Sequence, residues 1–319
     1  MNSSVETSGS PPYSLPLPAG SHTLSGLPSS GALPITKPSD HQAVPWWLWW
    51  NILSLDAPMV AVIWQILLGR QSGVPPSMIE SAVLALTVWL IYVADHLLDA
   101  WPPSMSSCVL QQRHLFCFRH RHTIILLMFL VAVAVAGLSI VFLSVVEIKS
   151  GLKVATVVLV YFICVHVLRM FAKTSVIKEV AVGFTFAAGV MLPCWSRTGS
   201  PSFVFPFIFL ALLCTLNCLI IESCEALHLA RPAITSVPPR CNAHLSHFAV
   251  ILSLAALSAL LIGGLRQRCA LTFLVASFAA ALLLLVNSLK SAVSAAAVSV
   301  LADVALLLPA ALTLALCKK

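Results

Sequence analysis

Long apolar runs alternate with short polar or proline-containing stretches along the chain from Pro45 to its C-terminal end. Most of these runs reach the about 20 residues that an α-helix needs to cross the hydrocarbon core of a bilayer. The pattern therefore predicts an all-α, polytopic membrane protein with about nine transmembrane helices. The predicted spans cover residues 46–68, 78–100, 123–146, 152–172, 178–195, 204–227, 245–265, 270–289 and 293–316.

Composition supports the same class. Of 319 residues, 59% are hydrophobic and only 9% are charged, which is more apolar surface than a soluble domain needs. The net charge of +7 comes from basic loops, so it indicates membrane topology and anion binding and gives no reason to expect a nucleic-acid partner. The ten cysteines are scattered without a CxxC pair, which favours small apolar fillers over a disulfide framework or a zinc site.

Residues 1–44 differ from the rest of the chain. Ser, Pro, Gly and Thr dominate this segment, which cannot bury enough apolar surface to offset the entropy lost on ordering. We expect a disordered N-terminal tail over residues 1–44 and a transmembrane domain over residues 45–319. Because the tail has neither a basic start nor a continuous apolar core, it is not expected to be a secretory signal peptide.

The first span contains a polar interruption. Four tryptophans between Trp46 and Trp50 suit the membrane interface, and the interruption from Asn51 to Pro58 follows them about a turn and a half inside the span. Asp56, two residues before Pro58, is consistent with a kink or with a residue that lines a cavity.

Basic residues concentrate in the loops after the second and fourth spans. The positive-inside rule then places those loops on the cytoplasmic side, although the bias over the whole chain is weak. An odd number of spans puts the termini on opposite sides. We predict an integral, multi-pass membrane protein with a cytoplasmic N-terminus, in the plasma or inner membrane if the chain is bacterial.

Acidic residues fall inside predicted spans, where a charge is expensive and usually faces a cavity or a partner. Asp95 and Asp99 are four residues apart and share a helix face at the end of span two, and Glu222 and Glu225 stand at the end of span six. Both ends face the side that carries the basic loops. Carboxylates beside Arg and Lys suit a diphosphate bridged by Mg²⁺, while plain hydration at the helix ends and ordinary topology signalling are the alternatives.

The segment from Ile91 to Asp99 matches the last two aspartates of the motif NDxxDxxxD, at Asp95 and Asp99, but has Ile91 and Tyr92 where that motif begins with Asn and Asp. This is the first of two aspartate-rich motifs in the UbiA-type superfamily of intramembrane aromatic prenyltransferases (4-hydroxybenzoate polyprenyltransferase-like). The chain resembles that superfamily as a divergent member over about residues 46–316. The resemblance implies a UbiA-like bundle of typically nine spans.

The second motif of that superfamily is matched by the segment from Asn217 to Glu225 in span six. The eight-residue spacing of its ends is kept, but Ile221 stands at the place of the middle acid and Glu222 follows it. Further similarities are Lys178-Glu179 at the start of span five and Asp303 and Pro309 in span nine.

In that superfamily a prenyl diphosphate lies in a cavity open to the lipid, and Mg²⁺ ions held by the two motifs grip its diphosphate. Departure of the diphosphate leaves an allylic cation that attacks an electron-rich acceptor. The resemblance implies that the chain is an Mg²⁺-assisted transferase that moves a prenyl group to an aromatic or other lipophilic acceptor. The implied catalytic residues and first-motif metal ligands are Asp95 and Asp99, with Asn217, Glu222 and Glu225 as second-motif ligands. The implied diphosphate contacts are Arg169, Lys173, Lys178, Arg119 and Arg121.

The departures from both motifs leave three interpretations open. The chain is an active prenyltransferase, or a UbiA-like accessory or binding protein whose chemistry is altered or lost, or an unrelated transporter. Transporters usually show internal repeats or paired broken helices, and the sequence shows neither. His166 and His228 are interpreted as packed or interfacial residues.

Overall fold

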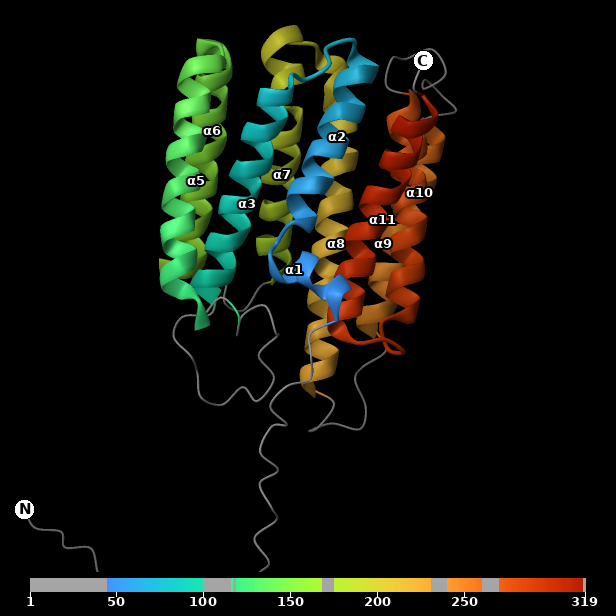
Figure 1. The fold of residues 1–319 in the computed structure, drawn as a ribbon. Helices are drawn as coiled ribbons and strands as arrows, with labels where there is room; N and C mark the ends of the chain where they lie inside the picture. The colour runs from blue at the N-terminus through green and yellow to red at the C-terminus, as the bar shows by residue number, and fades with distance from the viewer. Residues whose placement is uncertain are drawn as a thin grey trace, which may run out of the picture. The chain divides into compact units, whose positions relative to one another are not determined.

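The computed structural model describes residues 45–99, 116, 119–167, 175–230, 240–259 and 270–317, all within one compact unit of residues 44–319. These residues form helices and contain no strand (Figure 1). The expected N-terminal tail lies outside the described residues. The helices are α1 (Trp49–Ile52), α2 (Asp56–Ser72), α3 (Met78–Asp99), α5 (Arg121–Phe142), α6 (Val145–Phe162), α7 (Ser175–Thr198), α8 (Val204–Ala230), α9 (Arg240–Ala259), α10 (Ala270–Leu289) and α11 (Ala295–Leu316).

Most of these helices are long and apolar enough to cross a bilayer. Within the described residues seven meet that test alone, and the bent pair Trp46–Ile52 and Asp56–Ser72 brings the number to eight. The apolar part of α9, His244–Ala259, is shorter. The all-α class is therefore confirmed, the arrangement agrees with about nine spans, and the chain is an integral, multi-pass membrane protein.

The first span is broken at its polar interruption. A 3₁₀ turn (Trp46–Leu48) and α1 meet α2 at an angle of 76°, and Ser54 between them has a positive φ of 53°. Nδ2 of Asn51 donates a hydrogen bond to Asp56 across the break (2.6 Å), and Nε1 of Trp89 donates to the carbonyl of Leu53 (3.0 Å). The break precedes Pro58, which occupies the first turn of α2 where its missing N–H breaks no intrahelical bond.

The boundary between spans three and four was predicted wrongly. The expected span 123–146 ends at Phe142, and α6 begins at Val145 instead of near Leu152. The reason is a capping box, in which Ser144 and Glu147 exchange side-chain and backbone hydrogen bonds at the start of α6. A helix terminus satisfied in this way overrides a hydropathy pattern that runs on through Val145 and Val146.

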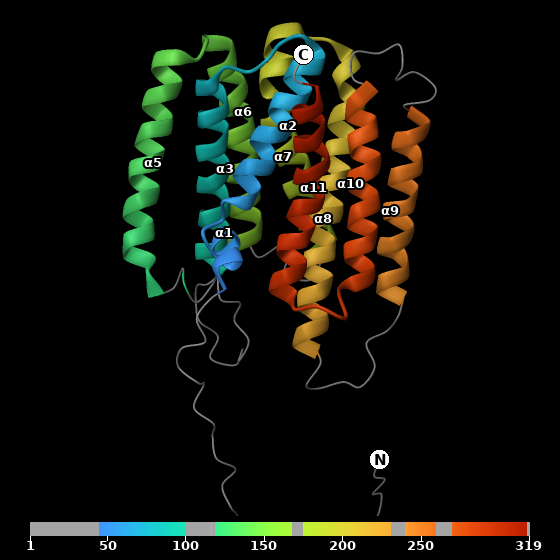
Figure 2. The same cartoon turned by 45° about the vertical axis from the view of Figure 1, so that its right-hand side comes forward.

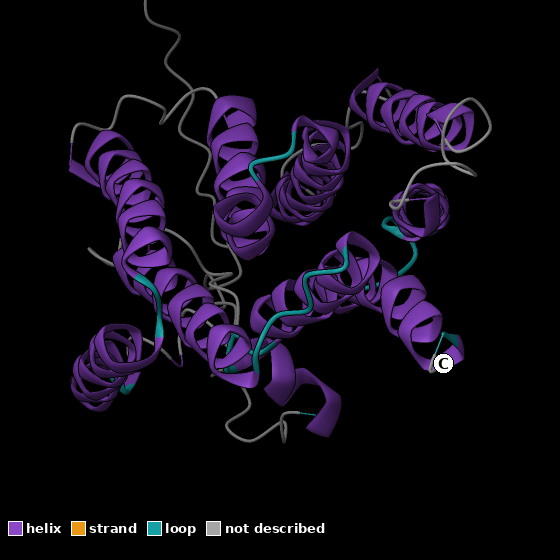
Figure 3. Ribbon diagram, turned by 90° about the horizontal axis from the view of Figure 1, so that it is seen from above, coloured by secondary structure: helices purple, strands orange, loops and turns teal. Residues whose placement is uncertain are grey.

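Helices α2, α7, α8, α10 and α11 supply most of the buried core. Figure 2 shows the bundle turned by 45°, and Figure 3 shows it from above. Trp64 of α2 is fully buried and donates from Nε1 to the carbonyl of Leu306 on α11 (3.1 Å). The helices α7 and α8 approach so closely that a Cβ atom added at Gly183 would lie 2.3 Å from Oγ1 of Thr215. By contrast, α5 has no buried residue and lies at the edge of the bundle in both side views.

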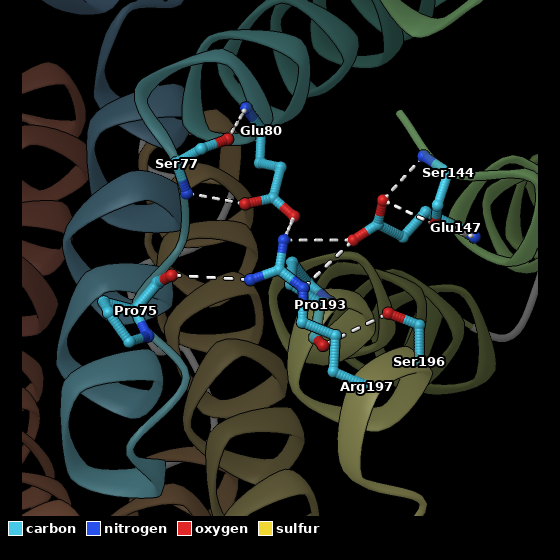
Figure 4. Close-up of polar contacts among 8 residues, drawn as sticks. All are labelled: Pro75, Ser77, Glu80, Ser144, Glu147, Pro193, Ser196 and Arg197. Atoms are coloured by element: carbon cyan, nitrogen blue, oxygen red, sulfur yellow. Dashed lines mark hydrogen bonds and ion pairs between the residues drawn. The ribbon is translucent and has the colours of Figure 1, made fainter. Parts of the chain in front are cut away.

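A charged cluster joins three helices at one end of the bundle (Figure 4). The guanidinium of Arg197, near the end of α7, pairs with Glu80 in the first turn of α3 and with Glu147 in the first turn of α6 (3.1 Å). Each carboxylate also accepts a backbone hydrogen bond at the start of its own helix, from Ser77 and from Ser144. One arginine thus links the N-termini of α3 and α6 to α7.

Candidate functional site

A cavity of about 280 Å³ lies at the other end of the bundle, where α3, α6 and α8 finish and α2, α7 and α11 begin. This end is at the bottom of Figure 1. Apolar and aromatic walls come from Tyr92 of α3, Tyr161 and Phe162 of α6, and Val182 of α7. The cavity is therefore a polar chamber with a partly aromatic wall inside a membrane-spanning bundle.

Acidic side chains from five helices converge on this cavity. They are Asp56 (α2), Asp95 (α3), Glu179 (α7), Glu222 and Glu225 (α8) and Asp303 (α11). Lys178 and His96 are the basic side chains among its described lining residues. Because acidic side chains outnumber basic ones in its lining, the cavity attracts cations, and it attracts an anion only when a cation accompanies it.

Asp95 is held by a histidine from another helix. The Nε2 atom of His166 lies 3.0 Å from Oδ1 of Asp95, and the positive charge of Lys178 also acts on this carboxylate. His166 lies in a π-helical turn, Ile163–Val167, which continues α6. Widened turns of this kind frequently occur at functional sites, because they redirect side chains out of the regular helical register.

Two asparagine–aspartate pairs hold carboxylates that line the cavity. Nδ2 of Asn217 donates to Oδ1 of Asp303 (2.9 Å), which links α8 to α11. Nδ2 of Asn51 donates to Asp56 and also lies 3.1 Å from Oγ of Ser299, which links the broken first span to α11. The break in the first span therefore both bends the helix and brings Asp56 to the cavity.

The structure brings together five of the ten site residues that the sequence singled out. Asp95 from the first motif and Asn217, Glu222 and Glu225 from the second all line the cavity, as does Lys178. Arg119 and Arg121 precede and begin α5 and do not line it. The side chain of Asp99, and both Arg169 and Lys173, lie outside the described residues.

Several residues outside the set of site residues expected from the sequence also lie at this cavity, although the sequence already marks Asp56 as a kink or cavity-lining residue and Glu179 and Asp303 as similarities to the superfamily. Glu179, Asp56 and Asp303 line the cavity, and His166, interpreted as a packed residue, contacts Asp95. All four are ionisable groups inside predicted spans, which is by itself a signal for a cavity or a partner. Their convergence could not be predicted, because it depends on which faces of five helices meet.

The carboxylate oxygens that line the cavity are ligands of the type that Mg²⁺ prefers. Mg²⁺ prefers oxygen ligands and commonly binds through one or two carboxylates together with substrate phosphates and water. Asp95 and Glu225 offer such carboxylates from two helices across one cavity. Within the described residues, no three His, Cys, Asp or Glu side chains are already gathered as a metal group. The described residues therefore supply oxygen donors of the kind that Mg²⁺ prefers, but no preformed metal group.

Comparison of the chain with protein-family models, with curated proteins and with solved structures finds no match.

Proposed function

We propose that the protein is an intramembrane prenyltransferase that uses this cavity to move a prenyl group from a prenyl diphosphate to a lipophilic acceptor. The observation that carries the proposal is one cavity, inside a membrane bundle, in which carboxylates of α3 and α8 meet Lys178 and an aromatic wall. The sequence resemblance to UbiA-type prenyltransferases supports the same assignment.

Each part of the cavity has a role in this reaction. Asp95, Glu222 and Glu225 would hold Mg²⁺ against the diphosphate, and Lys178 would pair with the remaining phosphate charge. Bound Mg²⁺ supplies neutralisation of the charge that grows on the leaving oxygen. The Tyr92, Tyr161 and Phe162 rings of the cavity wall would exclude water and stabilise positive charge through their π-electrons.

The bond changes balance within this set of groups. The allylic C–O bond of the prenyl diphosphate breaks, and its electron pair leaves with the diphosphate. A new bond forms between the allylic carbon and the nucleophilic atom of the acceptor. The proton that the acceptor loses passes to a cavity carboxylate, of which Glu179 and Asp303 are available in addition to the proposed metal ligands.

The experiment is an assay of purified protein in lipid nanodiscs. Geranyl, farnesyl and geranylgeranyl diphosphate are supplied with Mg²⁺ and a panel of phenolic acceptors, and products are identified by mass spectrometry. We expect a prenylated acceptor and released diphosphate with the wild type, and neither with EDTA or with Asp95→Asn. As a matched control, Glu80→Gln changes a buried carboxylate at the far end of the same helix and should keep the activity in folded protein.

A second candidate has a specific observation in its favour. Asp95 already has a hydrogen-bond partner in His166. In this second interpretation the chain is an accessory or binding protein, and its cavity holds a lipid ligand without converting it. Binding of prenyl diphosphate without any product, at every acceptor and every chain length, would favour this candidate over the transferase.

A further inference from the structure

Two lysines, Lys149 and Lys153, lie on the outer side of α6. Helix α6 packs against α7, where a Cβ atom added at Gly151 would lie 3.8 Å from Cδ1 of Leu192. Each lysine is two residues from Gly151, which is about 200° around a helix of 3.6 residues per turn. Both lysines therefore point away from α7, and both are exposed.

The rest of this outer face is apolar. Leu152 is exposed beside the lysines, and the exposed Val157 and Val160 continue their row along the helix. In a chain that spans a membrane, exposed apolar side chains of this kind contact lipid. The two lysines therefore lie at one end of a lipid-facing surface.

Lys153 lies deeper in the membrane than a residue at a helix end. The apolar segment Val145–His166 has 22 residues and is about 33 Å long, which matches the hydrocarbon core of a bilayer, about 30 Å thick. Lys153 follows Val145 by eight residues, about 12 Å along the helix axis. The methylene stem of a lysine covers only about half of that distance, so the ammonium group cannot reach the level at which the helix begins.

The described part of the chain offers these lysines no counter-charge, since neither of them forms an ion pair there. The nearest acid along the helix, Glu147, is already bonded to Arg197 and to Ser144. An unpaired charge within the hydrocarbon core is costly, and a counter-charge from the lipid removes that cost. The Cα–Cβ bonds of α6 tilt toward its N-terminus, which directs both stems toward the headgroups at the end of the bundle that carries Arg197.

We propose that Lys149 and Lys153 bind the phosphate of an anionic phospholipid. The two lysines are one turn apart, with about 5–6 Å between their Cβ atoms, so both ammonium groups can contact one phosphate. Phosphatidylcholine carries its own cation beside its phosphate, and that cation competes with the lysines, whereas phosphatidylglycerol has none. The inference goes beyond the proposed function, because it requires only that α6 spans the membrane.

Native mass spectrometry of the full-length protein tests this site. Protein in detergent is titrated with phosphatidylglycerol or with phosphatidylcholine of the same acyl chains, and the dissociation constant of the first bound lipid is measured. We expect the wild type to bind phosphatidylglycerol at least tenfold more tightly than phosphatidylcholine. Lys149→Gln/Lys153→Gln should lose most of this preference, whereas Lys149→Arg/Lys153→Arg, which keeps both charges, should retain it.

Arg70→Gln is the matched control for the single variant Lys153→Gln. Each variant removes one exposed cation from the half of the bundle that carries Arg197. We expect Arg70→Gln to keep the lipid preference and Lys153→Gln to lose part of it. Because these side chains are exposed, the variants are expected to fold.

Equal affinity of the wild type for the two lipids would overturn the proposal. A preference that persists in Lys149→Gln/Lys153→Gln would do the same. An equal loss in Arg70→Gln and Lys153→Gln would also overturn it, because it would indicate a general attraction between basic residues and anionic lipid in place of a site on α6.

Discussion

At the scale of single residues, the carboxylates of the cavity differ in their hydrogen-bond partners. Asp95 is bonded to His166, Asp303 to Asn217, and Asp56 to Asn51, so each of these three has a partner from another segment. Such hydrogen bonds orient a carboxylate and reduce the conformational freedom that it loses when a ligand binds. The two acids of α8, Glu222 and Glu225, instead lie one turn apart on the same helix.

The two acids of α8 should differ in their importance for binding. Glu225 keeps the eight-residue spacing from Asn217 that the second motif has, and Glu222 departs from it. We predict that Glu225→Gln weakens Mg²⁺-dependent binding of farnesyl diphosphate by about 10–100-fold, the range typical of changes around a metal. Glu222→Gln should weaken it less. Dissociation constants measured on both variants test the order, and a larger loss with Glu222→Gln would contradict it.

At the scale of helices, the contacts at the two ends of the bundle differ in kind. The cavity end holds carboxylates with few basic partners among the described residues, while Arg197 at the other end neutralises Glu80 and Glu147 together. The 22-residue helix α3 contributes to both ends and is about 33 Å long at 1.5 Å per residue. We therefore interpret the Arg197 cluster as a structural anchor for α3, α6 and α7.

Loss of the anchor should destabilise the bundle without touching the cavity. Arg197→Met leaves two buried carboxylates without their cation, which should lower the free energy of unfolding by about 1–3 kcal/mol, since the arginine itself is partly exposed. Unfolding followed by circular dichroism in detergent measures the change. The exposed Arg70, at the end of α2, serves as the control, and equal stability of Arg70→Met and Arg197→Met would argue against an anchor.

Close packing of α7 on α8 depends on a residue without a side chain. A Cβ atom at Gly183 would lie 2.3 Å from Oγ1 of Thr215 and 2.6 Å from the carbonyl of Ala211, and the backbone atom cannot move aside alone. Gly183→Ala should therefore lower the unfolding free energy by about 1–3 kcal/mol through overpacking.

Gly137 provides the comparison for that variant. A Cβ atom there would meet nothing within 4 Å, so Gly137→Ala should be neutral or should stabilise α5 by up to about 1 kcal/mol through helix propensity. Thermal unfolding of both variants tests the pair. If Gly183→Ala were as stable as Gly137→Ala, α7 and α8 would not pack as closely as described.

At the scale of the whole molecule, the helical class and most spans could be predicted from hydropathy alone. The sequence also identified Asp95, Glu222 and Glu225, because charges inside apolar runs stand out. It could not predict that Asn217 would bond Asp303 from a helix 86 residues away, or that His166 would bond Asp95. Such contacts depend on the rotation of each helix about its axis, which packing determines.

The path of the chain makes a prediction about topology. Trp46 precedes the start of α2 at the cavity end, while α11 begins at the cavity with Ser299 and Asp303 and finishes at the opposite end. In a background without other cysteines, Trp46→Cys should react with a membrane-impermeant maleimide from the cytoplasmic side, and the exposed Cys317 from the other side. Labelling of both positions from one side would contradict an odd number of spans.

The central claim is that the cavity binds a prenyl diphosphate together with Mg²⁺, and direct binding tests it best. Farnesyl thiodiphosphate, which resists turnover, is titrated into the protein in nanodiscs with Mg²⁺, with EDTA, and with Mg²⁺ on Asp95→Asn. We predict saturable binding with Mg²⁺, at least tenfold weaker binding with EDTA, and a comparable loss with Asp95→Asn, because the carboxylate and the ion act together. Binding of equal strength under all three conditions would contradict the claim.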